Sequence, residues 1–202
     1  MRRSFLSQRF VLGAAALLGL CFVLDCSHVV AEGPSAGASE DKNRSLQAFA
    51  PVASVLRSPR CLNCHIPGES PLQGDDGKPH SMNVKRGPDG RGTPAMRCEN
   101  CHQSQNSSTP HSPPGARNWR LPPPATPMAW QGVGIGDLCR TLKDPAKNGG
   151  RTLPQVVEHF ETEQLVLWAW NPGPGRVSPS ISHDEFVAKV KEWIETGAAC
   201  AE

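Results

Sequence analysis

Cys61-Leu62-Asn63-Cys64-His65 and Cys98-Glu99-Asn100-Cys101-His102 are two copies of the pattern C-x-x-C-H. Each copy is typical of a site where a c-type haem is covalently attached. Two thiols at this spacing bond to one haem, and the imidazole that follows binds its iron. The sequence therefore predicts two covalently bound haem c groups. The predicted anchors are Cys61, Cys64, Cys98 and Cys101, and the predicted proximal iron ligands are His65 and His102.

Two other kinds of site use pairs of cysteines. Four thiolates in two C-x-x-C pairs can hold a tetrahedral zinc ion, and a single C-x-x-C pair can be a redox-active dithiol. Neither site needs a histidine directly after each pair, and both pairs here have one. The doubled histidine therefore favours haem.

The composition is lean for a conventional protein core. Aromatic residues make up 5% of the 202 residues, tyrosine is absent, and there are 19 glycines and 20 prolines. Much of the chain must therefore be loop. A large apolar cofactor supplies part of the core that the side chains lack, as metals do in small domains. We expect a mainly α fold with extensive irregular loops, organised as a dihaem cytochrome c with a small C-terminal helical unit.

The first 31 residues have the pattern of an export signal. A basic head is followed by the apolar run from Phe10 to Leu24 and a small-residue cleavage site at residues 29–31. The run is short for a membrane span, which needs about 20 apolar residues. We expect a periplasmic protein, with membrane association only through an uncleaved N-terminal segment. Residues 32–45 are small and polar, and we expect a flexible leader there.

The charge of the remaining chain is balanced. Residues 32–202 contain 18 basic and 18 acidic side chains, so the exported polypeptide is neutral. Such a balance gives no basic surface for nucleic acid or for anionic lipid. We expect no nucleic-acid partner.

Residues 46–131 form the predicted dihaem-binding region. Residues 46–56 predict either a short helix interrupted near Pro51 or a loop packed against the first haem. A proline-histidine-serine sequence follows each motif, so His80 and His111 are the predicted distal iron ligands, without an assignment to either haem. Methionine also serves as a distal ligand and raises the reduction potential. The methionine alternatives are Met82, Met96 and Met128.

The segment 103–131 is rich in proline and polar residues, which excludes regular helix. We expect an extended strap over a haem, with the rings of Trp119 and Trp130 covering its face or edge. Arginine matches carboxylates well, so three arginines near the motifs are candidate partners for haem propionates. They are Arg86, Arg91 and Arg97.

Residues 132–202 predict a C-terminal helical unit. A short helix is expected at 137–143, and capping boxes begin further helices at Thr152 and Ser182. Their apolar faces are core. His159 and His183 are interpreted as surface or near-cap histidines rather than haem ligands, although either could reach an iron. Cys139 and Cys200 lie outside the motifs, and in an oxidising compartment they predict a disulfide.

Four further stretches carry a resemblance to a known family. The chain resembles a family of bacterial exported dihaem cytochromes, often described as an isoquinoline 1-oxidoreductase subunit, over most of residues 55–200. The resemblance implies electron transfer, with a molybdenum hydroxylase or another oxidoreductase as redox partner. The stretches are residues 71–77, 82–88, 142–150 and 168–176.

The predicted function is electron transfer through haems whose irons are held by six ligands, with the protein setting the potentials. One alternative is a peroxidase-like dihaem enzyme in which one iron lacks a distal protein ligand. Another is a docking subunit that relays electrons within a larger oxidoreductase complex. The presence of enough histidine and methionine for both irons favours the carrier.

Overall fold

The computed structural model describes residues 36–202, so the predicted signal at 1–31 and residues 32–35 lie outside it. The described chain is mainly α with little strand, as predicted. Its helices are α1 (Ala36–Leu56), α2 (Pro59–Leu62), α3 (Ile135–Lys143), α4 (Leu153–Thr162), α5 (Gln164–Trp168) and α6 (His183–Glu195). Its strands are β1 (Leu72–Gln73), β2 (Lys78–Pro79), β3 (Gly92–Thr93) and β4 (Met96–Arg97).

Helix α1 corrects two expectations. It runs without interruption through Pro51, and it includes residues 36–45, which we expected to be a flexible leader. One face of the helix is buried at three- and four-residue spacing, which fixes it against the rest of the molecule. That face consists of Ser45, Ala48, Phe49, Val52, Ala53, Val55 and Leu56. Residues 36–45 contain only small, polar and charged side chains, so this part of the helix carries no hydrophobic signal.

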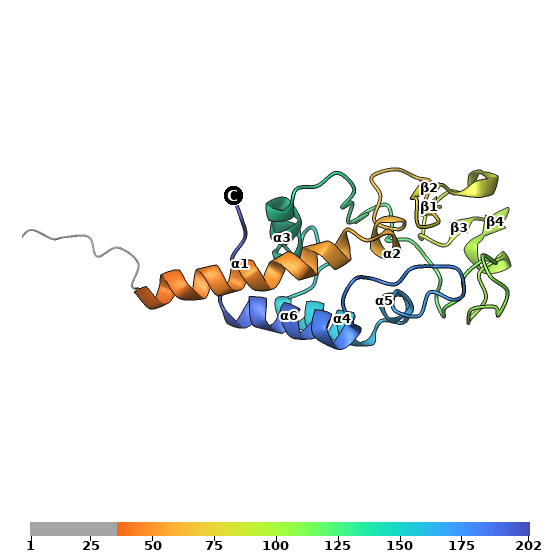
Figure 1. The fold of residues 1–202 in the computed structure, drawn as a ribbon. Helices are drawn as coiled ribbons and strands as arrows, with labels where there is room; N and C mark the ends of the chain where they lie inside the picture. Colours follow the sequence, from red (N-terminus) through yellow and green to blue (C-terminus); the bar gives the residue numbers. More distant parts are fainter. Residues whose placement is uncertain (1–35) are drawn as a thin grey trace, which may run out of the picture. The chain divides into compact units, whose positions relative to one another are not determined.

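The core lies between α1 and the C-terminal helices. Helix α6 runs along α1, and α3 and α4 complete the cluster (Figure 1). Trp193 of α6 is fully buried and packs on Phe49, with ring centres 5.0 Å apart. Ser45 accepts a hydrogen bond from the main chain of Ala199 (2.8 Å) and donates one to the carbonyl of Trp193 (2.9 Å). These contacts join the first helix to the end of the chain.

The core draws on both sides of residue 132. Residues 36–202 belong to one compact unit, in which α1 packs against helices from the C-terminal part. The predicted disulfide between Cys139 and Cys200 is present and ties α3 to the chain end. No helix among residues 36–202 is long and apolar enough to span a membrane.

The predicted helix starts agree with the structure. Ser182 accepts a hydrogen bond from the main chain of Glu185 (3.1 Å) at the start of α6. At the start of α4, the main-chain N–H of Thr152 donates to the side chain of Gln155 (2.9 Å). These caps satisfy main-chain groups that the first helical turn leaves free. They fix where α4 and α6 begin.

Two short antiparallel hairpins flank the motifs in the other part of the unit (Figure 1). In the first, Leu72 pairs with Pro79, and the hairpin follows the first motif. In the second, β3 and β4 lead directly into the second motif. Residues 103–131 contain no helix or ladder strand and make one isolated bridge, so they form the irregular strap that the prolines predict.

Candidate functional site

The first C-x-x-C-H motif folds into a tight helical turn. Helix α2 brings in Cys61, whose carbonyl accepts hydrogen bonds from the main-chain N–H of Cys64 (3.2 Å) and of His65 (3.1 Å). Residues three and four apart share one side of a helical turn. The turn therefore presents both thiols and the imidazole on the same side.

The second motif repeats this arrangement. The carbonyl of Cys98 accepts from the main-chain N–H of Cys101 (3.2 Å) and of His102 (2.9 Å). The turn at residues 98–100 is a short 3₁₀ helix, entered directly from β4. The two motifs, 37 positions apart in sequence, thus make the same main-chain bonds.

The proximal imidazoles are oriented in the same way. Nδ1 of His65 lies 2.9 Å from the carbonyl of Met128, and Nδ1 of His102 lies 2.8 Å from the carbonyl of Pro114. A carbonyl only accepts, so each Nδ1 carries the proton and donates it. Nε2 of each ring then keeps its lone pair, which is the state in which histidine binds a metal.

Burial favours this neutral state. It lowers the pKa of His65 and of His102 to about 4, mainly because a charged imidazolium is poorly solvated there. Both accepting carbonyls belong to the strap at 103–131. One irregular segment therefore positions both rings.

Two tryptophans of the strap lie flat on these imidazoles. Trp130 stacks on His65 with ring centres 3.5 Å apart and planes 3° apart. Trp119 stacks on His102 at 4.3 Å and 5°. We expected the indoles to cover a haem face or edge. In this structure they instead lie against the imidazoles and hold their orientation.

A cavity of about 310 Å³ adjoins the first motif. Its wall includes the side chains of Cys61, Cys64 and His65, and the rest is largely apolar and aromatic. Two buried donors on the wall, Nε1 of Trp130 and Nε of Arg60, have no hydrogen-bond partner. Unpaired buried donors are rare and point to a missing acceptor.

These features fit a haem at the first motif. The paired thiols suit covalent attachment, the imidazole suits iron, and the apolar wall suits the macrocycle. The two unpaired donors suit propionate oxygens, which accept hydrogen bonds.

The zinc and dithiol alternatives fit less well. Burial raises the pKa of the Cys61 thiol to about 12 and that of Cys64 to about 11, whereas redox dithiols have a lowered thiol pKa. A zinc site needs about four ligands around one point. Across residues 36–202, no three His, Cys, Asp or Glu side chains gather closely enough to hold a metal ion.

Of the two predicted distal ligands, His80 reaches a proximal histidine. Its ring centre lies 6.0 Å from that of His102, and its Nδ1 bonds to the carbonyl of Ser81, which leaves Nε2 available. Imidazole nitrogens lie about 2 Å from a metal, so two rings on one ion have centres about 6 Å apart. The spacing of His80 and His102 fits such a pair.

His111 does not reach either proximal histidine. Its ring is exposed and packs on the main chain of Gly175, whose missing side chain makes room for it. Among the methionine alternatives, Met82 is 69% exposed and Met96 lies in β4. Met128 lines the cavity, and its own carbonyl binds Nδ1 of His65.

Two of the arginines proposed for propionates are engaged elsewhere. Arg86 is fully buried and donates to the carbonyls of Ile66 (3.0 Å), Gly68 (2.9 Å) and Pro122. Arg97 pairs with Asp89. Arg86 therefore joins the segment after the first motif to the strap. Arg60 also pairs with Asp75, but its Nε has no partner and remains a candidate donor to a propionate.

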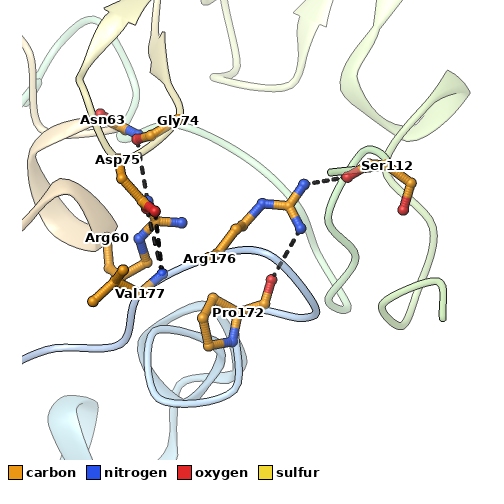
Figure 2. Close-up of polar contacts among 8 residues, drawn as sticks. All are labelled: Arg60, Asn63, Gly74, Asp75, Ser112, Pro172, Arg176 and Val177. Atoms are coloured by element: carbon orange, nitrogen blue, oxygen red, sulfur yellow. Dashed lines mark hydrogen bonds and ion pairs between the residues drawn. The ribbon is translucent and has the colours of Figure 1, made fainter. Parts of the chain in front are cut away.

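The loop at 172–177 connects the surroundings of both motifs. Figure 2 shows Arg60, which precedes Cys61, and the main chain of Val177 converging on the carboxylate of Asp75. From the same loop, Arg176 donates to the carbonyl of Ser112, downstream of the second motif. The motifs are also close enough for Cys98 to contribute to the raised pKa of Cys64. The two sites are thus neighbours.

His159 is a surface or near-cap histidine in the sequence interpretation, which places His80 and His111 ahead of it as iron ligands. This residue of α4 lines the cavity with the first motif and contributes to the lowered pKa of His65. His159 directly precedes the buried Phe160, so it lies beside the buried face of α4, at the edge of the core. This position was the signal in the sequence that His159 could line a cavity. Comparison with protein-family models, curated proteins and solved structures gives no match.

Proposed function

We propose that the chain is an exported dihaem c-type cytochrome that carries electrons between redox partners. The observation that carries the proposal is the repeated site: two turns with the same main-chain hydrogen bonds, each with an imidazole whose Nδ1 donates to a strap carbonyl. This arrangement leaves Nε2 of both rings ready for iron. Bound haem supplies one-electron chemistry at its iron.

The residues of the chain have separate tasks in this function. The thiols of each motif attach the cofactor, and the strap fixes the proximal imidazoles through its carbonyls and indoles. Arg60 and Trp130 offer donors at the first site. The disulfide between Cys139 and Cys200 suits an exported protein, because such bonds persist in oxidising compartments. The resemblance to exported dihaem cytochromes supports an oxidoreductase, such as a molybdenum hydroxylase, as electron donor.

Haem counting tests this proposal. The full chain is expressed in a bacterium with c-type haem maturation, and the purified product is weighed by denaturing mass spectrometry. We expect two haems per chain. The double variants Cys61→Ala/Cys64→Ala and Cys98→Ala/Cys101→Ala should each retain one.

The matched control is Cys139→Ala/Cys200→Ala, which removes two cysteines outside the motifs and should retain both haems. A wild-type chain that carries no covalent haem, with or without bound zinc, would overturn the proposal. A midpoint potential for each haem, with reversible reduction, then tests the carrier role. An iron that turns peroxide over would instead identify an enzyme.

A further inference from the structure

The first motif still needs a distal ligand if its iron is to be held on both faces. This question rests on the proposed function, because it concerns the same haem. Of the two histidines predicted from sequence, His80 lies at His102, and His111 packs on Gly175. The structure therefore leaves the iron at His65 without either of them.

His159 lies in the right place. It lines the cavity of about 310 Å³ whose wall also contains Cys61, Cys64 and His65. It also borders a second, more polar hollow of about 400 Å³ along α4. The imidazole thus stands where the apolar cavity meets a polar opening.

The ring of His159 is chemically free. Neither of its nitrogens has a hydrogen bond or ion pair within residues 36–202, although the ring is partly buried and packs near Phe160 at 6.0 Å. His183, the other histidine of the helical part, uses its Nε2 on the carbonyl of Phe160 (2.9 Å). The nitrogens of His159 keep some contact with solvent, and no bond to another described residue competes with a metal for them.

Helix α4 holds this ring in place. Val156 and Phe160 of the helix are buried in the core, and its first turn is capped by Gln155. His159 is three residues after Val156, so it sits on the edge of the buried face. A ligand on a rigid, capped helix is already ordered before it binds.

Met128 is a weaker candidate for the same position. Its carbonyl binds Nδ1 of His65, so its main chain lies at the edge of the ring away from Nε2. A distal ligand must approach from beyond Nε2, on the opposite face of the haem. His159 comes from a separate element, α4, and can meet this requirement.

We propose that His159 is the distal iron ligand of the haem attached through Cys61 and Cys64. His80 then serves the haem attached through Cys98 and Cys101. Both irons would be held by two histidines, one from the motif and one from a distant part of the chain.

The experiment uses the full-length protein loaded with both haems, after mass spectrometry has confirmed two haems in every variant. Low-temperature EPR and optical spectra are recorded for the wild type, His159→Ala, His80→Ala and His111→Ala. We expect two low-spin haems in the wild type and one high-spin haem in His159→Ala. His111→Ala is the matched control and should keep both low-spin signals.

Two further measurements separate ligation from a structural effect. Added imidazole should restore the low-spin signal of His159→Ala, because it can fill the vacated position. His159→Met should stay low-spin while the midpoint potential of one haem rises, as methionine ligation raises it.

The outcomes distinguish the two proposals. If no haem is attached to the wild type, the proposed function fails. If two haems are attached but His159→Ala keeps both low-spin, or His111→Ala loses one, His159 is not the ligand and the function stands. A wild type with one high-spin haem also overturns the assignment, because that iron is open.

Discussion

Replacing Arg86 by methionine tests whether the strap is held to the first motif as the structure shows. The Arg86 guanidinium is buried and donates to three main-chain carbonyls, two of them on residues just after the motif and one on the strap. Methionine has a similar length and no donor. The substitution therefore leaves three carbonyls without a partner while it changes the side-chain volume little.

The expected loss follows from these three bonds. A buried acceptor that loses its donor costs about 1 to 3 kcal/mol. The carbonyl of Ile66 is on a buried residue, whereas Gly68 and Pro122 are more exposed, so water can replace part of the loss there. We expect the free energy of unfolding to fall by about 3 kcal/mol, near the lower end of the summed cost of three unpaired acceptors.

Urea unfolding of the full-length protein, followed by far-ultraviolet circular dichroism, measures this change. Arg97→Met is the matched control, since Arg97 pairs with the exposed Asp89 and such surface pairs contribute little. Arg86→Lys should fall between the two, because lysine keeps the charge but lacks the planar fork of donors. If Arg86→Met destabilises no more than Arg97→Met, the three bonds do not hold the strap and the reasoning is refuted.

Three further predictions concern other parts of the molecule. Ser45→Ala should lower the free energy of unfolding by about 1 kcal/mol in urea, because it leaves the main-chain N–H of Ala199 unpaired, whereas the carbonyl of Trp193 keeps its bond from the main chain of Ala198 (2.8 Å). Cys139→Ala/Cys200→Ala opens a loop spanning 61 positions and should cost up to about 4 kcal/mol in the same assay, without changing the haem count. A methyl group on Gly115 would overlap the carbonyl of Gln105. The resulting shift would displace the carbonyl of the preceding residue, Pro114, which bonds to His102. Gly68, in contrast, has open space around it. Gly115→Ala should therefore alter the EPR signal of the second haem alone, and Gly68→Ala should alter neither.

The parts that the sequence predicts are those set by local chemistry. The motif C-x-x-C-H fixes the sequence separation of its two cysteines and its histidine. Once a helical turn forms, Cys61, Cys64 and His65 therefore lie on the same side of it. The caps at Thr152 and Ser182 are local in the same sense. The disulfide was predictable because only two cysteines remain after the export signal and the motifs are set aside.

The parts that the sequence misses depend on distant contacts. The start of α1 was wrong because residues 36–45 contain no large apolar side chain, and Ser45 is buried only through helix α6 and the chain end. The carbonyl that accepts from Nδ1 of His65 belongs to Met128, 63 residues later. All main-chain carbonyls of the strap are chemically equivalent, so the sequence does not indicate which one His65 meets. His159 was ranked below His80 and His111 for the same reason, since only the packing of α4 brings it to the cavity.

The two sites share a local design and differ in their surroundings, which sets an expectation for their potentials. The first lies against a largely apolar, partly open cavity, and the buried Arg60 on its wall is paired with Asp75, whereas Cys101 of the second is exposed. Burial disfavours the more positive, oxidised state of an iron centre. The first site should therefore have the higher potential, and the exposed second site should receive electrons from the partner. In the proposed carrier this difference would direct electrons inward from the surface, because the sites are neighbours joined by one strap and one loop.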